Sequence, residues 1–191
     1  MEYICLSRSN YNLNEYSISP YRAEDMFLIM NWRNEQIAVL RQNKLLTKDE
    51  QIQYYHNYIE PSFSQITPKQ ILFSFLFKNT CIGYGGLTNL DWVNKKAELS
   101  FLVETQRAKN DTIYKKDFST FITLMKTICF EELNFNRLFT ETYEFRKYHI
   151  SILEENGFIY EGTLRQNVLF ENKFINSHIH SIISQDYGKH I

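Results

Sequence analysis

The sequence predicts an α/β (α+β) fold: one domain, residues 1–191, in which a mixed, mostly antiparallel central sheet of about seven strands has helices on both faces. Segments rich in aromatic and β-branched residues alternate along the chain with segments whose apolar residues recur at helical spacing. No internal repeat and no linker rich in Gly, Ser or Pro divides the sequence. A chain of this length can bury about 70% of its unfolded surface in a single core.

The first part of the chain is predicted to form one short strand and two helices. The stretch YSISPYR alternates as a strand does, and residues 22–43 carry apolar side chains mostly at helical spacing. Thr47 is expected to begin the second helix with a capping box, because Glu50 follows three residues later.

The rest of the chain is predicted to alternate strands with two further helices. The predicted strands are QILFSFLFK, CIGYGGLTNL, AELSFLVE, RLFTETYEF and the segments near 158–170 and 174–184, which meet at the turn ENK. The predicted helices cover residues 118–133 and 147–156. We expect the last helix to end at Asn156-Gly157, because glycine reaches the left-handed conformation without a Cβ penalty.

Composition excludes several functional classes. The formal net charge is -1, which gives no general attraction to nucleic acid or to an anionic membrane. The three cysteines are widely spaced and fit a reducing cytoplasm, and we see neither a signal peptide nor a membrane span. His178 and His180 lack a nearby third ligand, so no metal is expected, and no hydrolase, zincin or P-loop motif is present.

Several segments, in this order, resemble the Gcn5-related N-acetyltransferases (GNAT), in the branch of ribosomal-protein and amino-sugar acetyltransferases. They are IGYGGLTNLDWVNKKAELSFLV, FEELNFNRLFTETYE and SILEENGFIYEGTLRQ, and the resemblance covers roughly residues 16–184. It implies the GNAT fold, acetyl-CoA as cosubstrate and direct acetyl transfer to a primary amine through a tetrahedral intermediate. It also implies that strands 97–104 and 137–143 splay, so that the pantetheine arm adds to the open edge.

The resemblance suggests how acetyl-CoA is held. An amide near Leu102 or Val103 would stabilise the oxyanion of the intermediate. The family usually cradles the pyrophosphate with Gln/Arg-x-x-Gly-x-Gly/Ala at the start of the long helix, but this chain has no glycine there. We expect the corresponding loop at residues 113–118, where Lys115, Lys116 and the amides of Asp117 and Phe118 would replace it, with Asp117 as a plausible N-cap. A charged, solvated loop without a ligand fits the same residues equally well.

Acetylation of an amine requires a base, because only the neutral amine attacks. Glu98 is the first candidate, since it begins a splayed strand where the family holds the substrate; pairing with a cross-strand cation is the alternative. Asp91, the second candidate beside the substrate, is more typical of a turn. The family often has a tyrosine as general acid where this chain has Leu153, and Tyr148 or His149, one helical turn earlier, could substitute.

The acceptor is expected to be a small molecule, with a nucleotide-linked amino sugar as the best guess. The stretches MNWRNEQIAVLRQN and EGTLRQNVLFENKF resemble bacterial enzymes that acetylate such sugars. Arg33 and Arg41 could bind a diphosphate, while Trp32 and the pair at residues 54–55 could stack on a ring, although ordinary helix packing also explains them. A protein N-terminal amine as acceptor, or a non-catalytic acyl-CoA-binding domain, remains an alternative. A homodimer is possible.

Overall fold

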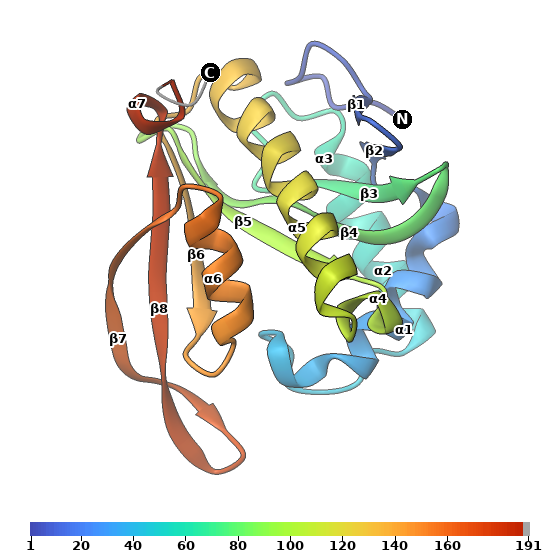
Figure 1. Ribbon diagram of the computed structural model, residues 1–191. Coiled ribbons are helices and arrows are strands. Elements are labelled where there is room, and N and C mark those ends of the chain that lie inside the picture. The colour runs from blue at the N-terminus through green and yellow to red at the C-terminus, as the bar shows by residue number, and fades with distance from the viewer. Residues whose placement is uncertain (189–191) are drawn as a thin grey trace.

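The computed structural model describes residues 1–188 and contains an eight-stranded sheet in the order β1-β2-β3-β4-β5-β6-β8-β7 (Figure 1). The strands are β1 Tyr11–Leu13, β2 Tyr16–Pro20, β3 Ile71–Phe77, β4 Thr80–Asp91, β5 Lys96–Val103, β6 Arg137–Tyr143, β7 Ile159–Phe170 and β8 Lys173–Ile183. Every neighbouring pair is antiparallel except β5 and β6. This confirms the predicted mixed, mostly antiparallel sheet; the additional strand is the short β1.

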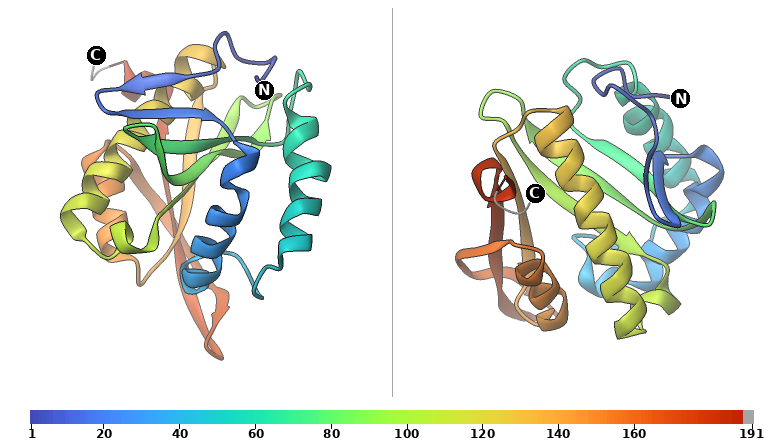
Figure 2. Two further views of the ribbon diagram at one scale, coloured as in Figure 1. Left: turned by 90° about the vertical axis from the view of Figure 1, so that its right-hand side faces the viewer. Right: turned by 45° about the horizontal axis from the view of Figure 1, so that its top comes forward.

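Helices cover both faces of the sheet. They are α1 Met26–Glu35, α2 Lys48–Tyr54, α3 Glu60–Ser62, α4 Thr105–Ala108, α5 Asp111–Lys126, α6 Lys147–Glu155 and α7 Ser184–Tyr187. The two views of Figure 2 show α5 and α6 on one face and α1 and α2 on the other. Two short 3-10 segments flank α1, and α2 and α5 each continue into a π-helical turn. None of the helices in residues 1–188 is long and apolar enough to cross a membrane.

Two predicted helix boundaries were wrong. The predicted helix over residues 22–43 shortens to α1, which ends at Glu35, and the following residues form one 3-10 turn and then an irregular segment. The long helix begins at Asp111 and not near Phe118, because Asn110 caps it by accepting a hydrogen bond from the amide of Ile113 at 3.1 Å. The apolar residues at 37–40 continue the helical spacing past the end of α1, and the polar residues before Phe118 carry no apolar periodicity from which the start of α5 could be read.

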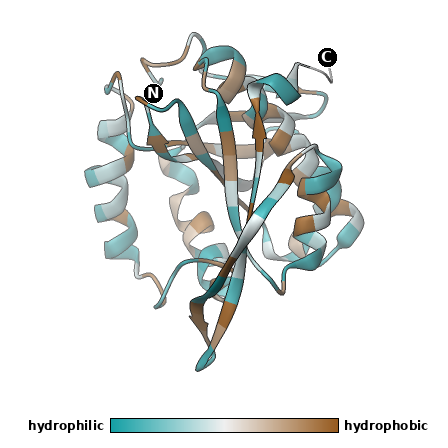
Figure 3. Cartoon of the chain, turned by 90° about the vertical axis from the view of Figure 1, so that its left-hand side faces the viewer, coloured by the Kyte–Doolittle hydropathy of each residue, from teal (hydrophilic) through white to brown (hydrophobic). Residues whose placement is uncertain are grey.

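The predicted local signals were otherwise correct. Thr47 and Glu50 form the expected capping box at the start of α2. Gly157 has a φ of +83° directly after α6, which lets the chain leave the helix and enter β7. Glu171 and Asn172, in the predicted turn between β7 and β8, both have positive φ, as a two-residue hairpin loop requires. This hairpin extends well beyond the rest of the sheet (Figure 3).

The join between β5 and β6 defines the centre of the molecule. These strands are parallel and pair over only three positions, Lys96–Glu98 with Arg137–Phe139. Beyond Glu98 the two strands separate, while β5 remains paired with β4 and β6 with β8. The predicted splay is therefore present, and it leaves one edge of β5 open over residues 99–103.

The core beneath α5 fixes the position of that open edge. Phe101 of β5 stacks on Phe118 of α5, with ring centroids 4.7 Å apart, and also contacts Phe121. Phe118 and Phe121 are fully buried. Gly85 of β4 allows this close packing, because a Cβ atom there would lie 2.9 Å from the Phe121 ring. Burial of these rings, worth roughly 1.5–3 kcal/mol each, holds β5 and α5 together beside the splay.

Candidate active site

A cavity of about 190 Å³ lies at the splay. Its walls come from β4, β5, β6, α1, α5 and α6 and from the segment 39–41 at the end of the second 3-10 turn. We call the part lined by the open edge of β5 together with α5 and α6 the donor side. We call the part lined by α1, by segment 39–41 and by the carboxylates of β5 and β6 the acceptor side.

On the donor side, the open edge of β5 offers backbone amides. The amide of Glu104 donates to the Ile82 carbonyl at 2.7 Å, and Leu102 pairs with Tyr84 in the same register. Alternation in an antiparallel ladder therefore turns the amide of Leu102 toward β4 and those of Phe101 and Val103 toward the splay. Of the two amides expected at the oxyanion, the register favours Val103 over Leu102.

His149 of α6 lies on the donor side in a neutral state. Its ring stacks on Phe118 with centroids 4.2 Å apart, and burial, followed by the charge of Arg146, holds the pKa of His149 well below its usual value. The Arg146 guanidinium, which can only donate, lies 3.3 Å from Nδ1, and the Tyr114 hydroxyl lies 2.7 Å from the same nitrogen. Nδ1 is therefore the acceptor, and the neutral ring carries its hydrogen on Nε2. Such a ring is a hydrogen-bond donor and a poor proton source at neutral pH.

Tyr148, the other expected acid, does not line the cavity. Its hydroxyl donates to the carbonyl of Asp111 at 2.9 Å, and the side chain is 40% exposed. The side chain thus connects α6 to the first residue of α5. The structure brings His149 to the splay and does not bring Tyr148 there.

The phosphate loop expected at residues 113–118 was wrong, because these residues form the first two turns of α5. The amides of Asp117 and Phe118 lie inside the helix, where they are engaged in its hydrogen bonds and cannot bind phosphate. The donors left free at the helix start are the amides of Asp111 and Thr112, since Asn110 accepts from Ile113. Lys109 lies two residues before Asp111 in the sequence.

Asp117 has a structural role that its sequence position did not reveal. Its carboxylate is fully buried and receives two hydrogen bonds from Arg107, at 2.7 and 2.8 Å, and one from the Tyr16 hydroxyl at 2.8 Å. These contacts tie α4 and β2 to α5. The residue is neither the N-cap nor a phosphate ligand.

Lys115 and Lys116 lie on the outer surface of α5. Lys115 Nζ forms an ion pair with Glu155 of α6 at 2.6 Å, and Lys116 Nζ lies 5.8 Å from the ring centre of Tyr16. Both positions are three to five residues, about one helical turn, away from the free amides at the helix start. The structure therefore does not bring these two lysines together with those amides.

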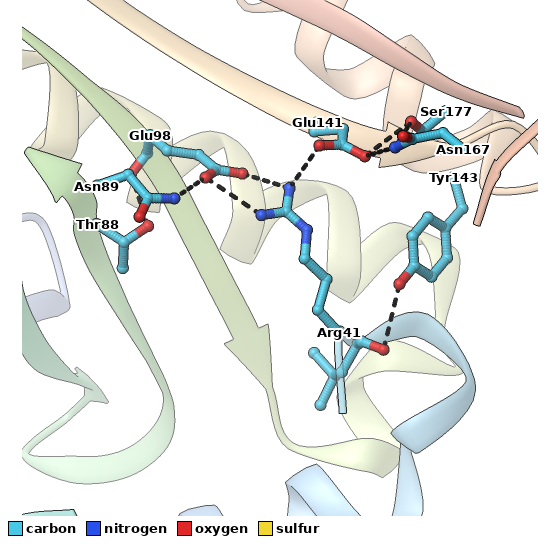
Figure 4. A network of polar contacts seen from close by, with 9 residues as sticks. Arg41, Thr88, Asn89, Glu98, Glu141, Tyr143, Asn167 and Ser177 are labelled. Atoms are coloured by element: carbon cyan, nitrogen blue, oxygen red, sulfur yellow. Dashed lines mark hydrogen bonds and ion pairs between the residues drawn. The ribbon is translucent and has the colours of Figure 1, made fainter. Parts of the chain in front are cut away.

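On the acceptor side, Glu98 is nearly buried and is held by polar contacts from other elements (Figure 4). The residue is 6% exposed, and its Oε2 accepts a hydrogen bond of 2.6 Å from Asn89 Nδ2. Asn89 has a φ of +48° at an irregularity in β4, and this bulge aims its side chain at Glu98. Arg41 donates to Glu98 Oε1 at 2.6 Å and to Oε2 at 3.3 Å. The predicted base is therefore at the splay, paired with a cation from another element.

A second carboxylate faces Glu98 across the splay. Glu141 of β6 accepts from Arg41 at 3.3 Å, so the guanidinium lies between the two acids (Figure 4). The other Glu141 oxygen accepts from Ser177 Oγ and from Asn167 Nδ2, both at 2.7 Å. These two donors come from β8 and β7, which fixes Glu141 in place.

Arg33, predicted to bind the substrate, reaches the cavity from α1. Its Nε donates to Gln42 at 3.0 Å, and its Nη1 donates to the hydroxyl of Tyr84. No carboxylate in residues 1–188 forms an ion pair with it. Arg33 is thus a largely enclosed cation whose partners are neutral.

The remaining predicted substrate residues lie elsewhere. Trp32 and Tyr55 are buried in the core, 6% and 3% exposed, so neither ring can stack on a ligand. Asp91 closes the turn after β4 by accepting from the amide and side chain of Asn94, at 2.8 and 2.7 Å, and does not line the cavity. These hydrogen bonds hold the pKa of Asp91 below its usual value. The turn-forming interpretation of Asp91 is therefore the one that its contacts support.

A polar groove continues from the acceptor side. Thr88 lines both the cavity and this groove, of about 510 Å³, which lies along the end of α2, the π-helical turn that follows it, α3 and the loop before β3. Its other walls are mostly phenol and amide side chains, and Lys69 is its one charged lining residue within the described chain. They include Asn57, Tyr54, Tyr58, Gln65, Gln70 and Asn89. Of the aromatic pair at 54–55, only Tyr54 is thus available to a ligand.

Sequence reasoning missed Glu141, Asn89 and Arg146. Glu141 alternates with threonines in a strand and carries no motif, and Asn89 matters only because a bulge turns it toward Glu98. Arg146 precedes α6 and donates toward Tyr114 and His149 at the cavity wall. Within residues 1–188, no group of three or more His, Cys, Asp or Glu side chains is arranged to hold a metal ion.

The sequence model of the acetyltransferase (GNAT) domain matches residues 18–179. The chain therefore belongs to the GNAT acetyltransferase family. It is an N-acetyltransferase that uses acetyl-CoA, and the amides on the open β5 edge are the groups to which an extended acyl chain can add. A search of curated proteins found none that matches the sequence.

Solved structures share this fold. Spermidine N-acetyltransferase from Vibrio cholerae in complex with CoA and spermine is similar with a TM-score of 0.80 and 16% identity, covering 92% of this chain and 99% of that one. A dodecameric structure of the Vibrio cholerae enzyme gives a TM-score of 0.75 at 16% identity, covering 92% and 97%. A probable acetyltransferase gives 0.72 at 19% identity, covering 91% and 96%. At these identities the similarity establishes the fold.

Proposed function

We propose that this enzyme acetylates the primary amine of a nucleotide-linked amino sugar, as the amino-sugar branch of the family does. The observation that carries this proposal is the environment of Arg33 on the acceptor side. Arg33 has only neutral partners there, and the adjoining groove is lined by amides and phenols without a carboxylate. A guanidinium without an acidic partner suits a phosphate, and amide and phenol groups suit sugar hydroxyls and a base.

Glu98 is the base in this proposal. Its nearly complete burial and the fixed hydrogen bond from Asn89 leave its Oε1 facing the cavity, where it now binds Arg41. A carboxylate held in this way can accept the proton of an incoming ammonium, and the neutral amine is then free to attack. Glu141 would orient the same ammonium from the opposite strand.

Acetyl-CoA supplies the activated acetyl group. In our proposal the amide of Val103 or Phe101 on the open β5 edge stabilises the negative charge that develops on the acetyl oxygen. The amides of Asp111 and Thr112, with Lys109, would hold the pyrophosphate at the start of α5, where the helix dipole favours anions. On the donor side, His149 would donate a hydrogen bond from Nε2 to an acceptor atom of the bound cosubstrate and so help to orient it.

A polyamine acceptor is the second candidate, because two carboxylates already hold a cation at the splay. The Vibrio cholerae neighbour was solved with spermine, and a guanidinium between Glu98 and Glu141 resembles a bound ammonium. A polyamine, however, needs further carboxylates along its length. The groove beyond Thr88 is lined by one charged residue, Lys69, and by no carboxylate in the described chain.

The deciding experiment compares acceptors under one set of conditions. We expect kcat/KM for a UDP- or CMP-linked amino sugar to exceed that for spermidine, for the free amino sugar and for a peptide with a free N-terminus by at least about tenfold. The release of CoA thiol measures each rate. Higher kcat/KM for spermidine would favour the polyamine, and higher kcat/KM for the peptide would favour a protein substrate.

A further inference from the structure

Arg41 is a charged side chain of the cavity that no step of the proposed mechanism uses, and it lies where the acceptor must bind. Its guanidinium contacts Glu98 at 2.6 Å and Glu141 at 3.3 Å (Figure 4). Asn89 already donates to Glu98 Oε2, so Arg41 takes the remaining access to this carboxylate. An acceptor ammonium carries the same charge and needs the same oxygens. Arg41 and the ammonium therefore cannot both bind there.

We propose that Arg41 is a specificity-determining residue: it occupies Glu98 and Glu141 until an acceptor that carries an anionic group draws its guanidinium away. The acceptor then places its own ammonium between the two carboxylates, while its anion pairs with Arg41. This inference rests on the proposed function in that the anion would be the diphosphate of the nucleotide sugar. One positive charge therefore lies between the two carboxylates both before and after the acceptor binds.

The position of Arg41 in the chain allows such a movement. It lies in an irregular segment between the second 3-10 turn, which ends at Val39, and α2, which begins at Lys48. The side chain is 50% exposed, whereas the Glu98 side chain is 8% exposed. Beside it, the Leu40 carbonyl accepts only a long hydrogen bond of 3.4 Å from Tyr143. The cation is thus the mobile partner, and the carboxylates are the fixed ones.

The surroundings explain why an anion alone or an amine alone is less effective. If Arg41 left without a replacement, Glu98 and Glu141 would face each other without a cation between them, which is unfavourable in a poorly solvated site. A simple amine has to compete with a tethered guanidinium that makes two hydrogen bonds to Glu98. An acceptor that carries both an ammonium and an anion gives the two carboxylates a new cation and gives Arg41 a new anion. Selection against simple amines follows from this competition.

The first test measures binding and does not depend on turnover. Spermidine and glucosamine, which lack an anionic group, are titrated by calorimetry into the CoA complex of the wild type, of Arg41→Gln and of Arg41→Lys. We expect Arg41→Gln to bind both amines about tenfold more tightly than the wild type, and Arg41→Lys to resemble the wild type. Arg8→Gln is the matched control, because Arg8 forms an ion pair with Glu132 outside the cavity. Unchanged or weaker binding of both amines by Arg41→Gln would overturn the proposal.

The second test uses inorganic diphosphate as the anion. In the wild type, millimolar diphosphate should tighten the binding of glucosamine several-fold, because it pairs with the displaced guanidinium; in Arg41→Gln it should have no such effect. With a nucleotide-linked amino sugar as substrate, Arg41→Gln should raise KM about tenfold and change kcat less. If the wild type turns over no nucleotide sugar, the proposed function fails, but the two binding results still decide the role of Arg41. Equal effects of diphosphate on both proteins would contradict it.

Discussion

On the donor side of the cavity β5 presents backbone amides, whereas on the acceptor side it presents the carboxylate of Glu98. The amides of Phe101 and Val103 are available because β6 turns away, whatever side chains these residues carry. The acceptor side depends on side chains from four different elements, those of Arg41, Asn89, Glu98 and Glu141. Donor binding therefore tolerates sequence change, and acceptor choice does not. The acyl chain of acetyl-CoA can therefore add to β5 even in a chain that lacks the family's usual glycine cradle for the pyrophosphate.

The largest effect that we expect concerns the acceptor side. Glu98→Gln keeps the shape but cannot accept a proton, so kcat/KM at neutral pH should fall about 10²–10⁴-fold. Activity of the variant should rise with pH, because the free amine becomes more abundant. Steady-state rates measured across pH values, together with acetyl-CoA affinity, test this. A wild-type rate at pH 7, or lost acetyl-CoA binding, would show a structural role.

A large effect on stability is expected beneath the donor side. Asp117→Asn removes the charge that pairs with Arg107 in a fully buried position, so the free energy of unfolding should fall by about 3 kcal/mol. Urea denaturation measures the change. Acetyl-CoA affinity of the folded protein should remain within about twofold, and Asp49→Asn, in the exposed first turn of α2, is the control. A selective loss of acetyl-CoA binding by Asp117→Asn would restore a ligand role for this residue.

A smaller effect should separate the true start of α5 from the one predicted. We expect Lys109→Ala to weaken CoA binding several-fold, because a positive charge two residues before the free amides is lost. The double change of Lys115 and Lys116 to Ala should alter it less than about twofold, since both lysines lie on the outer helix surface. Calorimetry with CoA and with a pantetheine thioester lacking phosphates distinguishes a phosphate contact from a folding defect. If the double variant loses more CoA affinity than Lys109→Ala, the phosphate site lies in the second turn of α5.

The smallest effect tests the neutral state of His149. Because its folded pKa is lowered, the unfolded chain takes up a proton below about pH 6.5 that the folded protein does not. The free energy of unfolding should therefore fall as pH decreases from 7 to 5, with a slope from this residue of at most about 1.4 kcal/mol per pH unit. His149→Asn should show a shallower slope in urea denaturation at several pH values. An identical slope would mean that His149 is protonated in the folded protein.

The parts of the fold that were predicted from sequence are those with strong local signals. The capping box at Thr47, the glycine after α6 and the aromatic strands all follow from neighbouring residues. The start of α5 could not be predicted, because Asn110 caps the helix through one side-chain hydrogen bond in a polar stretch without periodicity. The additional strand β1 has only three residues, too few to show alternation.

The candidate site divides in the same way. Glu98 and Arg33 were found because the family resemblance indicates where substrate lies, and both line the cavity. The pairing of Arg41 with Glu98 joins residues 57 positions apart, and that with Glu141 joins residues 100 apart, so no local pattern predicts it. Trp32 was wrongly expected on the surface, because α1 buries the face that carries it. The acceptor side is made by contacts between distant elements, and no local sequence pattern encodes such contacts.

The short pairing of β5 with β6 also has a mechanical meaning. Three paired positions are the ladder that joins β1–β5 to β6–β8, so the sheet is least continuous at the reaction site. An extended cosubstrate bound along residues 99–103 completes this interrupted ladder and acts as a missing strand. In amide hydrogen exchange we therefore expect Phe101 and Val103 to exchange quickly in the free protein and slowly once acetyl-CoA binds. The substrate is then part of the fold, and each catalytic cycle removes and restores it.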